Sequence, residues 1–270
     1  MKVLIGYLQY FPEKGNLRSN IEKVNELTKN NEFQILVLPE LAFSGYFYTS
    51  VQEIRPFIDI GFESPPAVFL KKLSKSKNAL ILSGFPEGAR GHIYNSQYAF
   101  FPNGEVRVYR KSHLFYKEKL VFAKGDSGPV LVNYMGVNVG MMVCFDWFFP
   151  EFARVLALKG AHVLALSANL VLPGLGQKGM VVRSIENRVF SVLSNRTGME
   201  ASSSGERLTF TGMSQITNER GDIITQSDES VEEVKIAEIE TDEAENKWVT
   251  PLNNIIEDRR VDFYREILDG

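Results

Sequence analysis

The sequence predicts one domain of the α/β class (α+β by some schemes) in which helices cover mixed β-sheets. Three observations support this prediction. Short apolar stretches alternate with stretches that carry apolar residues at helical spacing through residues 1–166. Hairpin-like strand pairs around 96–110 and 208–226 indicate that the sheets are mixed. No repeat, low-complexity tract or linker divides the 270 residues, and their 44% apolar content can supply one large core.

The N-terminal part reads as a strand, a helix and a second strand. Val3–Leu8 is an apolar run typical of a buried strand, and Pro12–Gly15 is turn-prone. Asn20–Lys29 carries apolar residues at helical spacing, and Phe33–Leu38 returns to a strand pattern. Glu40 therefore stands where the second strand ends.

The chain continues this alternation and places two further polar residues at strand ends. Lys111 follows a strand that a Pro-Asn-Gly turn joins to its neighbour, and Cys144 lies where a strand turns into a helix. The expected helices are Pro66–Lys75 and Pro150–Leu158, and the expected strands are Ala79–Phe85, Ser96–Phe101, Val106–Arg110, Val137–Cys144, Ala161–Leu166, Val189–Leu193, Leu208–Ile216, Asp222–Gln226 and Val234–Ile239.

Composition excludes several classes of function. A net charge of −3 without a run of Lys and Arg gives no reason to expect nucleic acid as a partner. Apolar runs such as Ile35–Leu38 are far shorter than the roughly 20 residues that cross a bilayer, so we expect no membrane partner. A single cysteine allows no internal disulfide, and Met1–Tyr10 goes directly into a strand pattern, which favours a cytoplasmic protein. His92 and His162 lack Cys or carboxylate neighbours at ligand spacing, so we expect no metal site.

Glu40, Lys111 and Cys144 are chemically complementary residues at three strand ends, where the active sites of sheet proteins collect. A thiol becomes a good nucleophile when a nearby cation lowers its pKa or a base takes its proton. Each residue also has a plain structural explanation, because a lone Cys is often a small core residue and a Lys at a strand end is usually solvated. The pattern alone therefore favours a structural role for each residue, and only the set of three points to chemistry.

The sequence around these residues resembles a known family. The stretches "LVLPELAFSGY" at 36–46, "YRKSHLF" at 109–115 and "GMMVCFDWFFPEFAR" at 140–154 are similar to the three signature blocks of the nitrilase superfamily of carbon–nitrogen hydrolases. The resemblance is closest to the archaeal thermostable nitrilase/amidase branch. It extends over nearly the whole chain and includes "FAKGD" at 122–126, "RSIENRVFSVLSNRTG" at 183–198, "FTGMS" at 210–214 and "DRR" at 258–260.

The resemblance implies a role for each of these residues and an architecture. It makes Cys144 the nucleophile, Glu40 the general base, and Lys111 the cation that stabilises the oxyanion with the backbone N–H of Phe145. A second glutamate of the family, which orients the substrate, falls on Glu118. The implied fold is a four-layer α-β-β-α sandwich with two mixed sheets. It forms a homodimer or a higher oligomer, to which a tail from about residue 240 contributes, and it needs no cofactor.

Several other residues are expected near the site. Trp147, Asn169, Tyr46 and Phe43 are plausible pocket walls that follow the strand ends, and no Arg in the three blocks faces the pocket. We therefore expect a small or aryl neutral acyl group. His113 is expected to hold the loop through a hydrogen bond, because the resembling family has no catalytic histidine.

The predicted function is hydrolysis of a non-peptide C–N bond in a small amide or nitrile through a Cys144 thioester, which releases ammonia and a carboxylic acid. An alternative is an N-carbamoyl-amine amidohydrolase that also releases CO₂, because "CFDWFFPE" is similar to the aromatic block of that branch. A further alternative is a catalytically silent binding subunit. A thiol hydrolase that pairs Cys144 with His113 is a more distant one.

Overall fold

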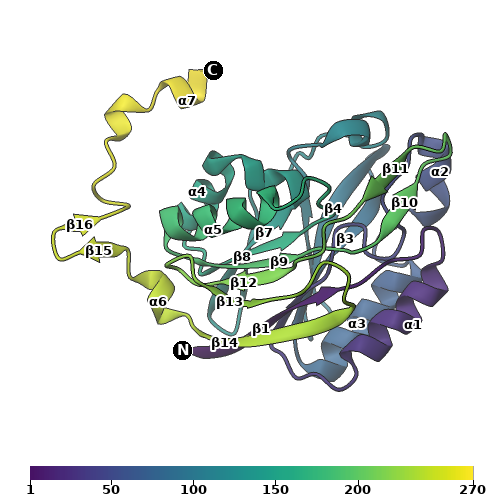
Figure 1. Ribbon diagram of the computed structural model, residues 1–270, viewed down its shortest axis with the longest axis horizontal. Helices are drawn as coiled ribbons and strands as arrows, with labels where there is room; N and C mark the ends of the chain where they lie inside the picture. Colours follow the sequence, from purple (N-terminus) through teal and green to yellow (C-terminus); the bar gives the residue numbers. More distant parts are fainter. Residues whose placement is uncertain (270) are drawn as a thin grey trace.

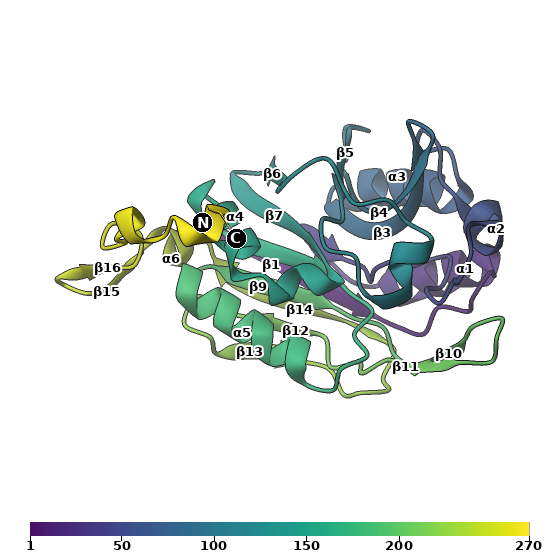
Figure 2. The ribbon, with the colours of Figure 1, turned by 90° about the horizontal axis from the view of Figure 1, so that it is seen from above.

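The computed structural model describes residues 1–269, and its centre is a pair of six-stranded sheets packed face to face (Figures 1 and 2). The first sheet has the order β14-β1-β2-β3-β4-β5. Strands β1, β2 and β3 are parallel, whereas β14, β4 and β5 pair antiparallel with their neighbours. The bounds are β1 Lys2–Gln9, β2 Ile35–Val37, β3 Leu80–Ala89, β4 His92–Phe100, β5 Val106–Arg110 and β14 Glu233–Glu240.

The second sheet has the order β13-β12-β9-β8-β7-β6 and repeats this topology. Strands β7, β8 and β9 are parallel, and β6, β12 and β13 pair antiparallel with their neighbours. The bounds are β6 Leu131–Tyr134, β7 Val137–Val143, β8 Val163–Ser167, β9 Phe190–Ser194, β12 Gln215–Thr217 and β13 Ile223–Gln226. Both sheets are therefore mixed, as predicted.

Two helices cover the outer face of each sheet. Helices α1 and α3 pack on the first sheet, and α4 and α5 pack on the second, on the opposite side of the molecule (Figure 1). The predicted four-layer α-β-β-α sandwich is confirmed. Pro65 and Pro150 stand at the first positions of α3 and α4, where a missing N–H costs no intrahelical bond. The bounds are α1 Leu17–Thr28, α3 Pro65–Lys77, α4 Pro150–Leu158 and α5 Leu175–Asn187.

Shorter elements fill the loops and the C-terminal tail. A two-stranded ribbon of β10 and β11 projects beyond the second sheet, and the tail after β14 leaves the body of the molecule (Figure 1). None of the helices in residues 1–269 is long and apolar enough to cross a membrane. The bounds are α2 Val51–Ile54, β10 Met199–Ala201, β11 Arg207–Thr209, α6 Asp242–Glu245, β15 Trp248–Thr250, β16 Asn253–Asn254, α7 Glu266–Asp269, and the 3₁₀ segments η1 Arg55–Phe57, η2 Tyr116–Leu120, η3 Cys144–Phe148 and η4 Val261–Phe263.

The structure corrects the sequence prediction at two places. The expected strand Leu208–Ile216 is two strands, β11 and β12, which belong to different sheets because the chain bends at Gly212 and Met213, both with positive φ. Helix α5 was not predicted, because Gly176 and Gly179 weaken its helical signal. Both glycines are needed for packing: a Cβ on Gly179 would lie 2.2 Å from the ring of Trp147.

Candidate active site

Glu40 lies at the carboxyl end of β2 and is completely buried. Its Oε1 accepts hydrogen bonds from Lys111 Nζ at 2.6 Å and from Asn95 Nδ2 at 2.7 Å. No donor among residues 1–269 bonds its Oε2. The backbone leaves β2 against Gly84, where a Cβ would lie 2.5 Å from the Glu40 Cα. One carboxylate oxygen of Glu40 is therefore held in place and the other remains available.

Lys111 follows β5 and is buried between two carboxylates. Its Nζ lies 2.6 Å from Glu40 Oε1 and 2.7 Å from Glu118 Oε1. The turn after β5 requires Gly125, because a Cβ there would lie 2.0 Å from the Arg110 carbonyl oxygen. Burial alone would lower the pKa of Lys111, but the charges of its carboxylate neighbours raise this pKa above its ordinary range. Lys111 is therefore a permanent cation.

Glu118 lies in η2 and only 5% of its surface is exposed, so it is not a solvated glutamate between Lys117 and Lys119. Its Oε1 accepts from Lys111 and from the hydroxyl of Tyr46 at 2.8 Å. Its Oε2 accepts from the N–H of Phe115 at 2.9 Å. Glu118 thus lies beside Lys111, which stands seven residues earlier in the same connection between β5 and β6.

Cys144 lies at the sharp turn between β7 and η3, with φ at +42°. Such a backbone conformation is unusual for a residue with a Cβ and persists only where the surroundings impose it. The buried side chain of Asp146 supplies this support, because it accepts from the N–H of Val143 at 2.9 Å and from Tyr109 Oη at 2.7 Å. His113 Nδ1 lies 2.7 Å from the other oxygen of Asp146. His113 therefore supports the turn, as expected.

The buried charges shift the pKa values of the acid–base groups. Burial raises the pKa of Glu40 to about 7; the charge of Lys111 opposes this shift and the charge of Glu118 adds to it. Burial and the charge of Glu40 also raise the pKa of the Cys144 thiol well above its ordinary value, while Lys111 opposes them. Asn169 links the thiol to the cluster, because it lines the same pocket as Cys144 and donates to the Glu40 carbonyl oxygen at 2.9 Å. These shifts favour a neutral thiol at neutral pH and a Glu40 that is only partly ionised there.

A narrow pocket opens beside Cys144. Its free volume of about 20 Å³ suits a small group. Of the residues predicted to surround the substrate, Phe145, Trp147 and Asn169 line it. Its remaining wall comes from Phe115, from the start of α5 and from the loop between β8 and α5, of which the sequence singled out only Asn169. Those further residues are Phe115, Leu170, Val171, Leu172 and Gly176.

Two predicted pocket residues lie elsewhere. Phe43 is in the core, where its ring packs on Phe69 and Phe85 between α3 and the first sheet. It points away from the site because the chain turns back at Leu41, which has positive φ. Tyr46 contacts the site through its hydroxyl bond to Glu118 and does not line the pocket beside Cys144. In the part of the chain that the structure describes, no three His, Cys, Asp or Glu side chains could hold a metal ion.

Comparisons with known proteins identify the family of this chain. A sequence profile of the carbon-nitrogen hydrolase family matches residues 4–247. The nitrilase of Pyrococcus abyssi (strain GE5 / Orsay) is 37% identical over 265 residues, which cover 97% of this chain and 99% of that protein. The N-carbamoylputrescine amidase of Arabidopsis thaliana is 28% identical over an alignment of 296 residues, which covers 99% of this chain and 95% of that protein.

A solved structure is also similar over the whole length. The crystal structure of a carbon-nitrogen hydrolase from Helicobacter pylori G27 matches with a TM-score of 0.86 at 26% identity, and the match covers 99% of each chain. The profile and the nitrilase relative each span most of the sequence. This chain therefore belongs to the carbon–nitrogen hydrolases of the nitrilase superfamily.

Proposed function

We propose that this protein hydrolyses a small neutral amide or nitrile through a Cys144 thioester, with Glu40 and Lys111 as the other catalytic residues. The observation that carries the proposal is the buried cluster in which Lys111 bridges Glu40 and Glu118, joined through the Glu40–Asn169 hydrogen bond to the pocket that Cys144 lines. Burial of two carboxylates and one ammonium costs desolvation free energy. Clusters of this kind occur at functional sites, where they act on a nearby nucleophile.

The first half of the reaction forms the thioester. Glu40 takes the thiol proton as the Cys144 sulfur attacks the amide carbon, and a tetrahedral intermediate with an oxyanion results. Lys111 and the backbone N–H of Phe145, in the first turn of η3 where such groups lack intrahelical partners, stabilise this oxyanion. Glu40 then returns the proton to the nitrogen. The C–N bond breaks and neutral ammonia leaves.

The second half releases the acid. Glu40, ionised again, takes a proton from water as the water oxygen attacks the thioester carbon. The second tetrahedral intermediate collapses, the C–S bond breaks, and the departing sulfur recovers its proton from Glu40. The products are a carboxylic acid and the free thiol. A nitrile reaches the same thioester after one additional addition of water.

The pocket supports a small neutral acyl group. Aromatic and aliphatic side chains form most of its wall, and no Arg or Lys side chain lines it. Asn169 is its polar exception and is 2% exposed. Its Nδ2 donates to the Glu40 carbonyl oxygen at 2.9 Å, which leaves its Oδ1 buried with no donor among the described residues. This oxygen would accept an N–H from a substrate amide, a group that a nitrile lacks.

An N-carbamoyl amine remains the second candidate, and the Arabidopsis relative supports it. A carbamoyl group presents the same –C(=O)NH₂ end to Cys144 and Asn169. Its hydrolysis differs from that of a simple amide in releasing CO₂ with the ammonia. The products therefore distinguish the two activities, whereas the catalytic residues would be the same for both.

A screen for ammonia release tests the proposal. Matched nitriles, primary amides and N-carbamoyl amines are incubated with the protein, CO₂ is measured in parallel, and Cys144→Ala serves as the blank. We expect ammonia from small neutral amides or nitriles and none from the blank. A silent binding subunit would release none from any substrate. Slow alkylation by iodoacetamide at neutral pH does not identify such a subunit, since burial and Glu40 raise the pKa of the thiol.

We also propose that the protein works as a homodimer. Helices α4 and α5 expose apolar side chains to solvent, among them Val155, Leu158, Val182 and Ile185. The tail exposes Phe263 and Leu268 and lines, together with α4, an open apolar groove of about 500 Å³. A second copy that covers these surfaces would bury them.

The setting we propose is the cytoplasm. Cys144, the only cysteine of the chain, is a free thiol in the site. A reducing compartment keeps such a nucleophile active.

A further inference from the structure

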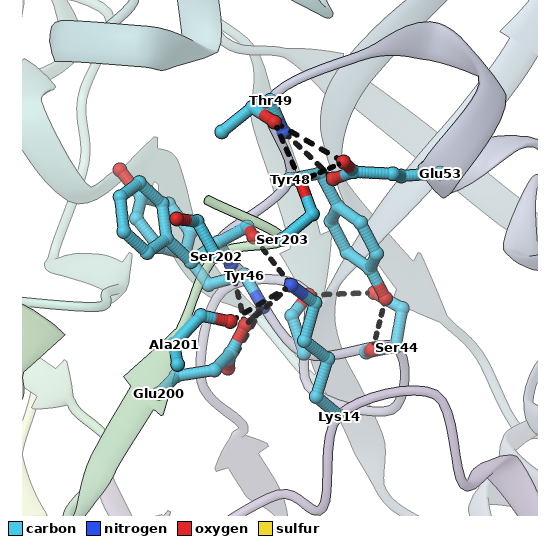
Figure 3. A network of polar contacts seen from close by, with 12 residues as sticks. Lys14, Ser44, Tyr46, Tyr48, Thr49, Glu53, Glu200, Ala201, Ser202 and Ser203 are labelled. Carbon is cyan, nitrogen blue, oxygen red and sulfur yellow. Dashed lines mark hydrogen bonds and ion pairs between the residues drawn. The ribbon is translucent and has the colours of Figure 1, made fainter. Parts of the chain in front are cut away.

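A second buried carboxylate, Glu200, lies outside the catalytic cluster. It belongs to β10, the first strand of the projecting ribbon, and 5% of its surface is exposed. Its two oxygens accept from the N–H of Tyr46 at 3.0 and 3.2 Å, and Oε1 also accepts from the N–H of Phe47 at 2.5 Å (Figure 3). Glu200 thus holds the backbone of the loop that follows Glu40.

Arg196 holds the same loop from another direction. Its fully buried guanidinium donates to Glu200 Oε2 at 2.5 Å and lies 4.1 Å from the centre of the Phe210 ring. The Phe210 ring in turn packs edge-on against the Tyr46 ring, with centroids 5.9 Å apart and planes at 88°. The ion pair therefore fixes both the backbone and the ring of Tyr46.

Tyr46 connects this ion pair to the catalytic cluster. Its hydroxyl donates to Glu118 Oε1 at 2.8 Å, and the same oxygen accepts from Lys111 Nζ at 2.7 Å. We propose that Glu200, paired with Arg196, is a positioning residue that sets the place of Lys111 through Tyr46 and Glu118. This inference rests on the proposed function, because it assigns to Lys111 the stabilisation of the oxyanion.

The chemistry of the ion pair favours this role over simple loop anchoring. A buried ion pair often stabilises a protein no more than apolar side chains of similar volume do. What it adds is a defined geometry of the groups that it joins. Glu53, the outer carboxylate of the same network, provides the contrast. It accepts from the N–H of Thr49 at 3.0 Å and from the Ser203 hydroxyl at 2.6 Å (Figure 3), and no hydrogen bond joins it to Tyr46 or Glu118. Glu53 anchors the loop at a distance from the catalytic cluster.

The test combines Glu200→Gln and Tyr46→Phe, singly and together, with Glu53→Gln as the matched control. Each single variant should lower kcat by roughly 10- to 100-fold and leave KM nearly unchanged, because misplaced catalytic groups cost rate rather than binding. The double variant should be no slower than the slower single variant, since both act through one path. Glu53→Gln should stay within about twofold of the wild type.

The pH dependence of kcat/KM gives a readout that a merely structural role would not change. The titratable groups near Glu40 are Lys111, Glu118, Cys144 and Tyr46, and its remaining hydrogen-bond partner is the neutral Asn95. The charge of Glu118 raises the pKa of Glu40. A displaced Glu118 therefore moves the acid limb of the profile to lower pH in Glu200→Gln and Tyr46→Phe, and leaves it in place in Glu53→Gln.

A last variant guards against unfolding. Phe210→Leu keeps both charges of the ion pair and removes the ring that packs between Arg196 and Tyr46, so it should move the acid limb in the same direction if Glu200→Gln does not fold. Additive losses in the double variant, or an acid limb unchanged in folded Tyr46→Phe and Phe210→Leu, would overturn the positioning role. A wild type that releases no ammonia from any substrate would overturn the proposed function instead.

Discussion

The two halves of the molecule share one topology and use it differently. In each sheet, three parallel strands are flanked by antiparallel ones, and the loops after β2 and β8 meet where Asn169 Nδ2 donates to the Glu40 carbonyl oxygen. The first half contributes Glu40 and Lys111, which buried hydrogen bonds and ion pairs hold. The second contributes Cys144, which a strained backbone turn holds. Charged groups inside a protein need polar partners, whereas a nucleophilic thiol mainly needs a backbone that points it at the substrate.

Removing the nucleophile of the second half should abolish activity with little effect on stability. Cys144→Ala should lower kcat by on the order of 10⁶-fold, as loss of a catalytic nucleophile does. The free energy of unfolding should change by about 1 kcal/mol or less, because alanine fits the space and leaves no charge unpaired. Ammonia release and urea unfolding measure the two effects. A large decrease in the free energy of unfolding would show that the stability of the second half, like that of the first, depends on its reactive residue.

Removing the cation of the first half should damage both properties. Lys111→Ala should lower kcat at least 10²- to 10³-fold, because an oxyanion donor is lost. It also leaves two buried carboxylates without their cation, which costs about 3–5 kcal/mol of unfolding free energy. Lys111→Arg should not restore the activity, since a planar guanidinium cannot replace a compact ammonium. Lys117→Ala, which removes a solvent-accessible ion pair with Glu206, is the control and should change neither property by much.

The acid–base group of the first half should be visible in the pH profile. Glu40 acts as a base only when ionised, and its pKa is raised to about 7, so kcat/KM should fall as the pH drops below about 7. Burial is the main cause, and the charge of Glu118 adds to it. Glu118→Gln should therefore move this limb to lower pH. A limb that stays in place while turnover and KM are unchanged would remove Glu118 from the site.

The smallest effect should come from the pocket wall of the second half. Trp147→Leu should extend the range of accepted acyl groups, with preference for a longer chain rising by about tenfold per methylene. Trp147 lines the pocket and packs directly on Gly179, whereas Phe148, its neighbour, is 52% exposed and does not line the pocket. Phe148→Leu is the matched control. An equal change of acyl-group preference in Trp147→Leu and Phe148→Leu would mean that these aromatic residues affect the substrate only through the folding of the protein.

Prediction from the sequence succeeded where the pattern is local. Apolar strands followed directly by Glu40, Lys111 and Cys144 are visible along the chain, because a strand and its exit lie within about ten residues. It failed for α5, whose glycines are explained only by Leu170 and Trp147 pressed against them. It also failed for Phe43, which the loop after Glu40 turns into the core. The sequence did not single out Glu200, because this residue contacts Tyr46 across 154 positions of the chain.

The sequence by itself determined the class of fold and the three residues at the strand ends, because hydrophobic periodicity and residue type are properties of short segments. Only the tertiary structure decided which groups share the site. The pocket of Cys144 could be joined to Glu40, and Phe43 removed from that pocket, only after the sheets had packed. The shift in the pKa of Glu40 has the same origin, because burial and neighbouring charges exist only in the folded chain.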